Sequence, residues 1–433
     1  MEIVSVADLK IGMFVAEPDC PWTEFSFAFQ GFVISSLEQV DIFQQKCRFV
    51  YVDRSRSLNE HYTAPKHEKD ARLKSSVFQN DRTEGMSSGL GLIEIADQDK
   101  RQSRRRRFLD FLHSQTDNEH AIAMSRELAH IEPRYDELSR ALEHSYSAFA
   151  EGRDVDVVAV REGLRDIAGS LQRNADAVMW LLRLKKRDQY SFDHAMDVSI
   201  HLLLLGGHIG WQGNKLLQLG MAGMLQDVGK VNLTPELLTK SVPLSEDEKA
   251  QVRSHVASSL EILCAQREIP QEVIVIISRH HERWDGSGYP RGLMLDQIGI
   301  EAEMAGLVDS FCAMLRNKPY RSALGHQEAL EELYALRDHK FNPNLMEQFV
   351  QCVGLYPIGT LVELNGGEVG VVIQQNRVHR SRPRVLLMLD ERKRKVSGYQ
   401  VIDLREDAHK AVRIVRALPY DAYGIAENDY YLG

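Results

Sequence analysis

The sequence predicts a multidomain α+β protein, with a central all-α bundle between a small N-terminal α/β domain and a small C-terminal β domain. Between residues 119 and 355, apolar residues recur every three or four positions, which is the period of a buried helix face. From residue 356 the period changes to short strand-length runs separated by turns. A chain of 433 residues is also long enough for several domains, each with its own core.

Residues 1–57 are predicted to form the small α/β domain. Strand-forming runs cover Ile11–Ala16, Phe27–Ile34 and Cys47–Val52, and Ser35–Gln45 has the pattern of a short helix. The segment contains no glycine-rich phosphate loop, so we assign it no chemistry and leave its role open.

Residues 58–118 are predicted to be a linker because they are polar and carry a cluster of glycines and serines. The basic run formed by Lys100, Arg101 and Arg104–Arg107 could contact a phosphate polymer or a membrane surface. Such a run is more often a solvated linker or the start of a helix, and we favour that interpretation.

Residues 119–355 are predicted to be helical, with two clear apolar stripes at the start. Gly152 lies between the stripes and is expected to end the first helix, while Asn174 is a candidate cap for a further helix. The stripes consist of Leu128, Ile131, Tyr135, Leu138 and Leu142, and of Val157, Val160, Leu164, Ile167 and Leu171.

Three predicted helices carry polar residues that chemistry could use. His194 lies early in the helix Ser191–Leu205. The nearly all-apolar stretch 216–230 is predicted to be a helix that ends at Gln226-Asp227 and is followed by Lys230. Buried charges of this kind are costly unless they are paired or bind a ligand. Ser245 and Glu248 form a capping box that opens the next predicted helix, which carries His255.

The segment 280–290, with the sequence HHERWDGSGYP, combines features of a metal site and of a ligand loop. His280 and His281 close an apolar run, and glycines in the loop allow the backbone to approach a ligand closely. A pair of adjacent histidines is often an accident of composition, since the chain has 16 histidines. Asp309 follows on a later helix, with small neighbours at helical spacing that leave room around its carboxylate: Ala305, Gly306, Cys312 and Ala313.

Residues 356–412 are predicted to form a small β-barrel or sandwich. Its strands are expected at Gly359–Leu364, Val369–Gln374, Arg384–Leu389 and Tyr399–Asp403, with a hairpin turn at Asn365-Gly366-Gly367. Residues 413–433 show no periodic pattern and are assigned to a tail.

Six candidate metal ligands lie on or beside successive predicted helices, with only the histidine pair adjacent. A helical bundle that projects one nitrogen or oxygen donor inward from each helix is a recurring two-metal scaffold. Six donors exceed what one tetrahedral ion needs, so two ions sharing the Asp227 carboxylate is the economical interpretation. The candidates are His194, Asp227, His255, His280, His281 and Asp309.

Composition excludes several classes of function. A formal net charge of −9 argues against a dedicated nucleic-acid surface. The N-terminus lacks the features of a signal peptide, and no stretch reaches the ~18 apolar residues of a membrane span, so we expect a cytoplasmic protein without an integral membrane segment. The five cysteines are scattered and odd in number, as expected of reduced thiols.

The motifs between about 190 and 350 resemble an HD-GYP domain, a bacterial subgroup of the HD phosphohydrolases. The matching pieces are His194 in its helix, LQDVGK (225–230), SHVASSLEIL (254–263), HHERWDGSGYPRG (280–292), LVDSFCAM (307–314) and KPYR (318–321). The resemblance implies an HD-type helical bundle with a core at 190–350. It also implies hydrolysis of cyclic di-GMP to pGpG or GMP, with two divalent ions, iron or manganese, as cofactors.

The same resemblance implies a role for each matching residue. The six candidates above would hold metal, Asp227 and Lys230 would act at the scissile phosphate, and the substrate would contact a further set of residues. That set is Gly288, Tyr289, Lys318 and Arg321.

The sequence departs from the family at the name-giving His-Asp doublet, which is Gln226-Asp227 in this chain. A neutral amide is a weaker ligand than imidazole for a transition metal, so one metal site is expected to be weak. Two classes of function therefore stay open. One is an active cyclic di-GMP phosphodiesterase, and the other is a degenerate protein that binds metal or cyclic di-GMP and acts through signalling partners. A hydrolase of another phosphate ester and a homodimer also stay open.

Overall fold

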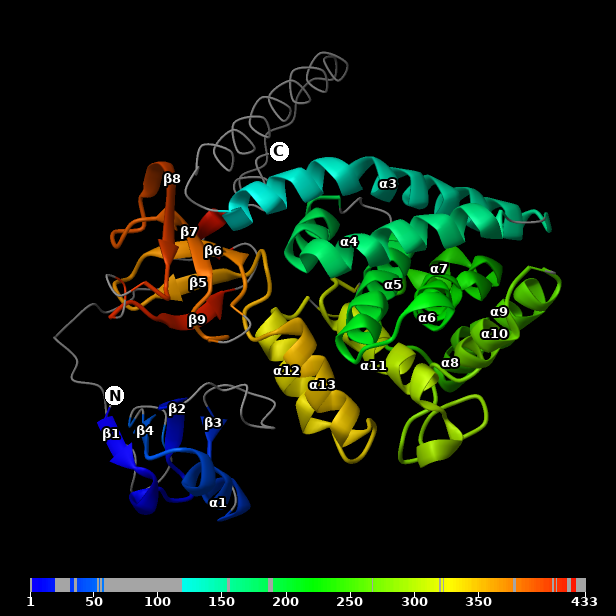
Figure 1. Cartoon of the computed structure of the whole chain (residues 1–433). Helices are drawn as coiled ribbons and strands as arrows, with labels where there is room; N and C mark the ends of the chain where they lie inside the picture. Colours follow the sequence, from blue (N-terminus) through cyan, green and yellow to red (C-terminus); the bar gives the residue numbers. More distant parts are fainter. Residues whose placement is uncertain are drawn as a thin grey trace, which may run out of the picture. The chain divides into compact units, whose positions relative to one another are not determined.

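The computed structural model of the chain contains two compact units (Figure 1). They comprise residues 1–108 with 432–433, and residues 109–431. Within them the structure describes residues 2–19, 32–34, 37–52, 54, 57, 119–153, 156–185, 190–266, 268–318, 321, 323–376, 379–406, 409, 411–418 and 422–425. The predicted linker 58–118 with its basic run lies outside the described residues.

The N-terminal unit contains a four-stranded antiparallel sheet in the order β1-β4-β2-β3. Its core includes side chains from the sheet and from the helix, among them Val15, Phe43 and Val50, all fully buried. The elements are β1 (Glu2–Ser5), β2 (Phe14–Pro18), β3 (Phe32–Val33), α1 (Leu37–Lys46) and β4 (Phe49–Val52). Strand β1 was not predicted, because only Val4 of its four residues is buried and the pattern is too short to detect.

The second unit is mainly helical, as predicted, and among its described residues between 190 and 350 no strand of a sheet occurs. The long helices α3 and α4 run side by side, and α5 packs against α6 and α11 (Figure 1). The α-helices are α3 (Glu119–Ala150), α4 (Val157–Leu184), α5 (Tyr190–His208), α6 (Gly213–Leu225), α7 (Pro235–Leu238), α8 (Glu246–Arg253), α9 (His255–Cys264), α10 (Gln271–Ile277), α11 (Ile300–Met314), α12 (His326–Ala335) and α13 (Pro343–Val353). The short 3-10 turn η4 (Val228–Asn232) follows α6.

Two helix boundaries differ from the sequence expectation. Asn174 does cap a helical segment, since its Oδ1 accepts from the Ala177 N–H at 3.1 Å, but the segment continues α4 across a kink. The helix opened by the Ser245–Glu248 capping box ends at Arg253, and His255 begins a separate helix, α9. The break places His255 at a helix start, where its ring can turn toward the end of α6.

A five-stranded antiparallel sheet in the order β8-β7-β6-β5-β9 lies near the C-terminal end of this unit. Its strands are β5 (Leu361–Leu364), β6 (Val369–Gln374), β7 (Arg384–Leu389), β8 (Lys395–Asp403) and β9 (Ile414–Leu418). Strand β9 falls in the stretch that we assigned to a tail, so that assignment was wrong for residues 414–418. They were missed because β9 alternates poorly, with only Leu418 buried, and pairing with β5 defines the strand.

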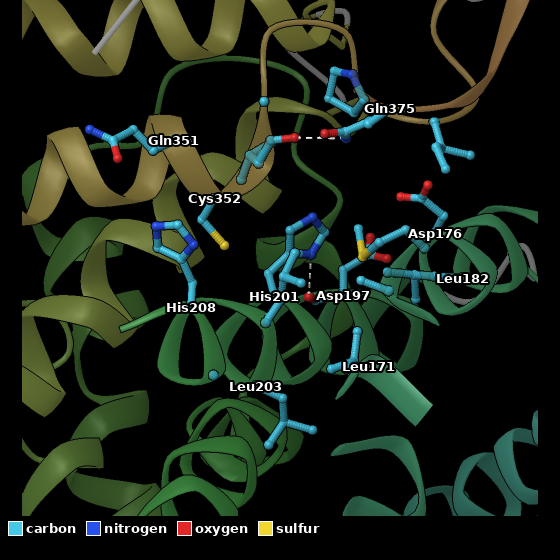
Figure 2. Close-up of a pocket in the computed structure, with 18 of the residues that line it drawn as sticks. Leu171, Asp176, Leu182, Asp197, His201, Leu203, His208, Gln351, Cys352 and Gln375 are labelled. Atoms are coloured by element: carbon cyan, nitrogen blue, oxygen red, sulfur yellow. Dashed lines mark hydrogen bonds between the residues drawn. The ribbon is translucent and has the colours of Figure 1, made fainter. Parts of the chain in front are cut away.

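A cavity of about 370 Å³ lies between α4, α5 and α13 and the residues around the start and end of β5 and β6 (Figure 2). Its lining includes Leu171 of α4, Leu203 of α5, Cys352 of α13 and Gln375, which follows β6. None of the six candidate metal ligands is among its lining residues. Among the described residues, no helix combines the length and hydropathy that crossing a membrane requires.

Candidate metal centre

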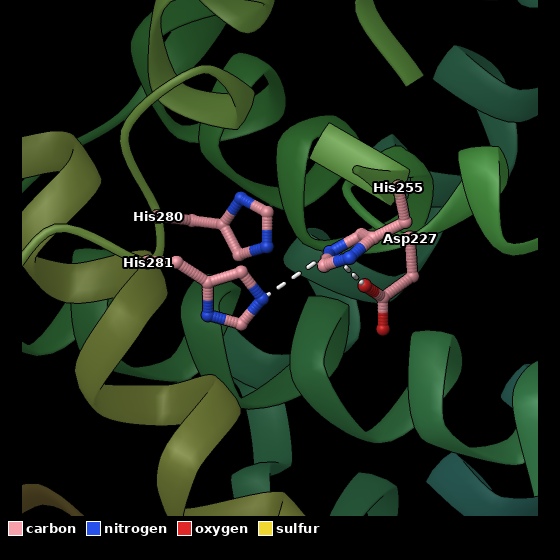
Figure 3. A group of neighbouring side chains, drawn as sticks. All are labelled: Asp227, His255, His280 and His281. Atoms are coloured by element: carbon pink, nitrogen blue, oxygen red, sulfur yellow. Dashed lines mark hydrogen bonds and ion pairs between the residues drawn. The ribbon is translucent and has the colours of Figure 1, made fainter. Parts of the chain in front are cut away.

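The structure brings the six candidate ligands together from five segments of the bundle. His194 is on α5, Asp227 follows the end of α6, His255 begins α9, the histidine pair follows α10, and Asp309 is on α11. Donor atoms within each of two sets lie no more than 4.8 Å apart. One set is Asp227, His255, His280 and His281 (Figure 3), and the other is His194, Asp227 and Asp309. Asp227 belongs to both sets, as a bridging carboxylate would.

The histidines of the first set present ring nitrogens to a common point. His255 Nε2 lies 3.2 Å from His281 Nε2 and 3.2 Å from Asp227 Oδ1. The Nδ1 atoms of His255 and His280 donate to the carbonyl oxygens of Val252 and Ile277, at 2.6 and 2.7 Å. This assigns each Nε2 as the unprotonated nitrogen, whose lone pair is available to a ligand.

His280 provides the clearest sign that a cation belongs at this point. Its side chain is fully buried, and its Nε2 has no hydrogen-bond partner among the described residues. An acceptor left unpaired in a protein interior is costly. A metal ion at this point would satisfy all these donors at once.

The protonation states of the cluster also suit a cation. Burial lowers the pKa of His280 to about 4, and burial likewise holds the pKa of His281 well below its ordinary value, so both rings are neutral near pH 7. Burial alone would raise the pKa of Asp227, but its charged surroundings, first among them the Lys230 ammonium, outweigh burial and hold the pKa well below its ordinary value. Neutral imidazoles beside an ionised carboxylate are the forms that bind metal.

The second set differs from the first because a glutamine side chain is hydrogen-bonded to one of its carboxylates. Gln226 is buried, and its Nε2 donates to Asp309 Oδ1 at 2.8 Å. His194 Nε2 lies 2.9 Å from the same oxygen and 3.9 Å from Asp227 Oδ2. Burial opposes ionisation of Asp309, yet the hydrogen bond from His194 helps to lower its pKa overall. The Asp309 carboxylate is therefore held by two donors from the protein itself.

Close packing of η4 on α9 fixes the Gln226-Asp227 pair. A Cβ atom on Gly229 would lie 2.2 Å from the His255 carbonyl oxygen, so only glycine fits at this position. The buried Ser259 hydroxyl accepts from the Gly229 N–H at 2.8 Å and donates to the Gln226 carbonyl at 3.0 Å. The sequence pattern Gly-Lys after the acid thus serves the local fold as well as the site.

A second close approach positions Asp309. A Cβ atom on Gly306 would lie 2.4 Å from the His280 carbonyl oxygen, so the glycine lets α11 pack directly against the histidine pair. From the sequence, the small residues around Asp309 are expected to leave room for a ligand. The structure shows that one of them, Gly306, provides room for the neighbouring backbone.

The loop after the histidine pair is tied to Glu282, a residue that we did not single out from the sequence. Its buried carboxylate accepts from the backbone N–H groups of Arg291 and Leu293 at 2.7 and 3.0 Å. Gly288 packs against the backbone of the same segment, where a Cβ atom would lie 2.4 Å from Glu282 Cα. The ring of Tyr289 then stacks on His281, with centroids 4.6 Å apart. An acid directly after paired histidines was the available signal.

The candidate phosphate-contacting cations lie in different places. Lys230 Nζ is 2.5 Å from Asp227 Oδ2, at the edge of the cluster. Lys318 and Arg321 are joined by backbone hydrogen bonds, and in the described part of the chain no hydrogen bond or ion pair joins either side chain to Tyr289. Arg253, which sequence reasoning missed, places its guanidinium 5.2 Å from the centre of the Tyr289 ring.

Comparisons with known proteins place this site in a family context. The HD domain family matches residues 181–345. A domain of unknown function matches residues 3–160, and a KOW domain associated with HD domains matches residues 361–424. The HD match spans all six candidate ligands, whereas the KOW match spans strands β5 to β9.

Three curated relatives illustrate the similarity. A cyclic di-GMP phosphodiesterase of Pseudomonas aeruginosa is 29% identical over 71% of this chain and 74% of its own length. A cyclic di-GMP phosphodiesterase response regulator of Xanthomonas campestris is 34% identical over 34% of this chain and 39% of its own. A 3′3′-cGAMP-specific phosphodiesterase of Vibrio cholerae is 29% identical over 45% of this chain and 36% of its own. The chain thus spans well under half the length of the latter two.

Proposed function

We propose that this chain, an HD-domain protein of the HD-GYP type, is a metal-dependent phosphodiesterase that hydrolyses cyclic di-GMP in bacterial second-messenger signalling. The observation that carries the proposal is the buried cluster in which Asp227 joins three imidazoles on one side and His194 with Asp309 on the other. Phosphodiester hydrolysis needs a polarised phosphoryl oxygen and an activated water, and clustered nitrogen and oxygen donors are what a hydrolytic metal site requires.

The charges of the site support a divalent cofactor, and we propose iron or manganese at two positions. Two ionised carboxylates beside the neutral rings of His280 and His281, offset by the single Lys230 ammonium, leave a negative charge that divalent ions would balance. When bound, such ions supply Lewis-acid activation of the phosphoryl group and of the attacking water. The hydrogen bonds from the Nδ1 atoms of His255 and His280 to backbone carbonyls would keep these two rings in a fixed orientation for metal binding.

The chain's own residues would bind and orient the substrate. Lys230, beside Asp227, would contact the scissile phosphate, and the Tyr289 ring with the Gly288 backbone would shape the wall next to His281. Lys318 and Arg321 would pair with ligand phosphate oxygens through charge-assisted hydrogen bonds. The names of relatives support this substrate class. The Vibrio cholerae relative makes 3′3′-cGAMP the alternative dinucleotide.

A second candidate function rests on Gln226. Its amide donates a hydrogen bond to Asp309, a candidate ligand of the second ion. A histidine at this position would instead offer that ion an imidazole nitrogen. A protein with one strong metal site would bind metal or cyclic di-GMP without turnover and signal through protein partners. This degenerate function is the alternative that the experiment must separate from catalysis.

The deciding experiment measures metal content and cyclic di-GMP hydrolysis of the purified protein with added manganese or iron. The wild type should hold metal and release pGpG or GMP, whereas His280→Ala should lose both, because the Nε2 atom of His280 points into the cluster without another partner. His144→Ala, on the exposed surface of α3, is the matched control and should behave as wild type. Metal without turnover at any metal concentration would favour the degenerate function, and neither metal nor turnover would refute both.

A further inference from the structure

The cavity of about 370 Å³, lined by residues of α4, α5 and α13, lies apart from the candidate metal centre. Its volume lies within the ~300–1,000 Å³ typical of small-molecule sites. One wall is apolar, formed by Leu171 and Leu182 of α4 and Leu203 of α5 (Figure 2). Polar groups face it from α13 and from the residue that follows β6, among them Cys352 and Gln375. An apolar body with a polar end fits such a lining.

Arg380 gives this cavity its chemical preference. The side chain lines the cavity and is half-buried, and within the described part of the chain it makes no hydrogen bond or ion pair. Burial lowers the pKa of its guanidinium, and the nearby Cys352 thiol opposes this. An arginine stays protonated despite such a shift, so a desolvated cation faces the cavity without a counter-charge.

The described acidic residues of the cavity lining form no ion pair with Arg380. Asp197 forms an ion pair with Arg316 at 2.6 Å. Asp176, on α4, also lines the cavity and forms no ion pair with Arg380. The guanidinium of Arg380 is therefore available to an anion that enters the cavity.

We propose that this cavity binds a small amphipathic anion, with a carboxylate, sulfonate or phosphate on Arg380 and an apolar body against the leucine wall. Burial of that apolar body supplies most of the affinity, and the charge-assisted hydrogen bonds to the guanidinium select the anion. This ligand class is independent of the phosphodiester chemistry at the metal cluster.

The location of the cavity makes the occupant a regulator. Helix α5 presents His194 to the cluster and Asp197 and His201 to the cavity, while α11 presents Asp309 to the cluster and Cys312 to the cavity. The Asp197–Arg316 ion pair connects α5 to the segment that follows α11. A ligand that shifts either helix would change the relative positions of metal-cluster donors.

The test uses 1-anilinonaphthalene-8-sulfonate, an aromatic sulfonate that becomes fluorescent in apolar sites, titrated into the purified full-length protein. The wild type should bind one equivalent saturably. Arg380→Gln should weaken binding at least ~10-fold, because it removes the charge but keeps the size. Gly207→Leu should also abolish binding, since Gly207 lines the cavity with open space around it and the new side chain would occupy that space. The exposed Arg392→Gln is the matched control and should bind as wild type.

A second arm defines the class of ligand. Decanoate should displace the dye and neutral decanol should not, because only the acid can pair with Arg380. Absence of saturable dye binding, equal binding by Arg380→Gln and wild type, or equal displacement by acid and alcohol would each overturn the proposal. The readout involves neither metal nor turnover, so the outcome is independent of whether the chain hydrolyses cyclic di-GMP.

Discussion

Replacing Gln226 by histidine tests the departure that most affects the proposed function. In the structure the Gln226 amide donates to Asp309 Oδ1 at 2.8 Å, and its Oε1 is buried without a hydrogen-bond partner among the described residues. An imidazole at the same place would lose the amide hydrogen bond and offer a nitrogen donor to the set formed by His194, Asp227 and Asp309. The substitution therefore exchanges stability of the metal-free protein for affinity toward a second ion.

The two effects have comparable and opposite magnitudes. A hydrogen bond to a charged group contributes about 1.5–3 kcal/mol, so the free energy of unfolding of the metal-free protein should fall by about 2 kcal/mol. An added imidazole should tighten the second ion on the order of 10–100-fold, the size of effect that even outer-shell partners have. An ion present at 100 times its Kd stabilises the folded state by about 2.7 kcal/mol. Adding metal should thus restore what the substitution removed.

The assay compares urea unfolding with chelator and with manganese, together with metal stoichiometry and cyclic di-GMP turnover. Gln226→Ala is the control, because it removes the same hydrogen bond without adding a donor. Gln226→His should approach two ions per chain, regain stability with manganese and turn over faster, whereas Gln226→Ala should only lose stability. Two ions and full turnover in the wild type would show that glutamine is tolerated and refute the reasoning. A histidine variant that gains metal but no turnover would instead favour the degenerate function.

Three further outcomes are expected. Gly306→Ala places a Cβ atom 2.4 Å from the His280 carbonyl and should lower the free energy of unfolding by about 1–3 kcal/mol in a urea melt, whereas Gly207→Ala, with open space, should raise it by about 0.5–1 kcal/mol. Burial depresses the pKa of His280 to about 4, so between pH 4 and 6.5 the folded metal-free protein binds fewer protons than the unfolded chain. The wild type should therefore lose up to about 3 kcal/mol of its free energy of unfolding as the pH falls from 6.5 toward 4, and His280→Gln should not show this loss in urea melts. Replacing Lys318 and Arg321 together by glutamine should weaken cyclic di-GMP binding in calorimetry at unchanged metal content, and loss of metal as well would assign them to the fold instead.

The fold class followed from the sequence because hydrophobic period is a local property. A few consecutive residues are enough to predict each of these elements: the apolar stripes predict α3 and α4, and the apolar runs predict β6 and β7. Strands β1 and β9 escaped notice because each is defined by its hydrogen-bonded neighbour, β4 or β5, rather than by its own pattern. The break before His255 was missed for a related reason, since the capping box marks where α8 begins and nothing comparable marks where it ends.

The sequence indicated which residues belong to the candidate site, but not which hydrogen bonds they make with one another. Residue type and spacing selected Asp227, His255 and the histidine pair, which the structure brings together. The hydrogen bond from Gln226 to Asp309 joins residues 83 positions apart, and no local pattern encodes it. The role of Gly306 is equally hidden, because it depends on how closely the His280 backbone approaches α11.

The geometry of the cluster divides into parts set locally and parts set by packing. The rings of His255 and His280 are each held by a carbonyl three residues earlier, so a single helical turn orients them. The carboxylates of Asp227 and Asp309 meet the imidazoles only when α6 and α11 have packed. Two carboxylates brought together in a buried space repel each other. The Lys230 ammonium offsets this repulsion at Asp227, and hydrogen bonds from His194 and Gln226 offset it at Asp309. Metal binding should therefore act on the packing of α6 and α11, and α11 also lines the cavity of about 370 Å³.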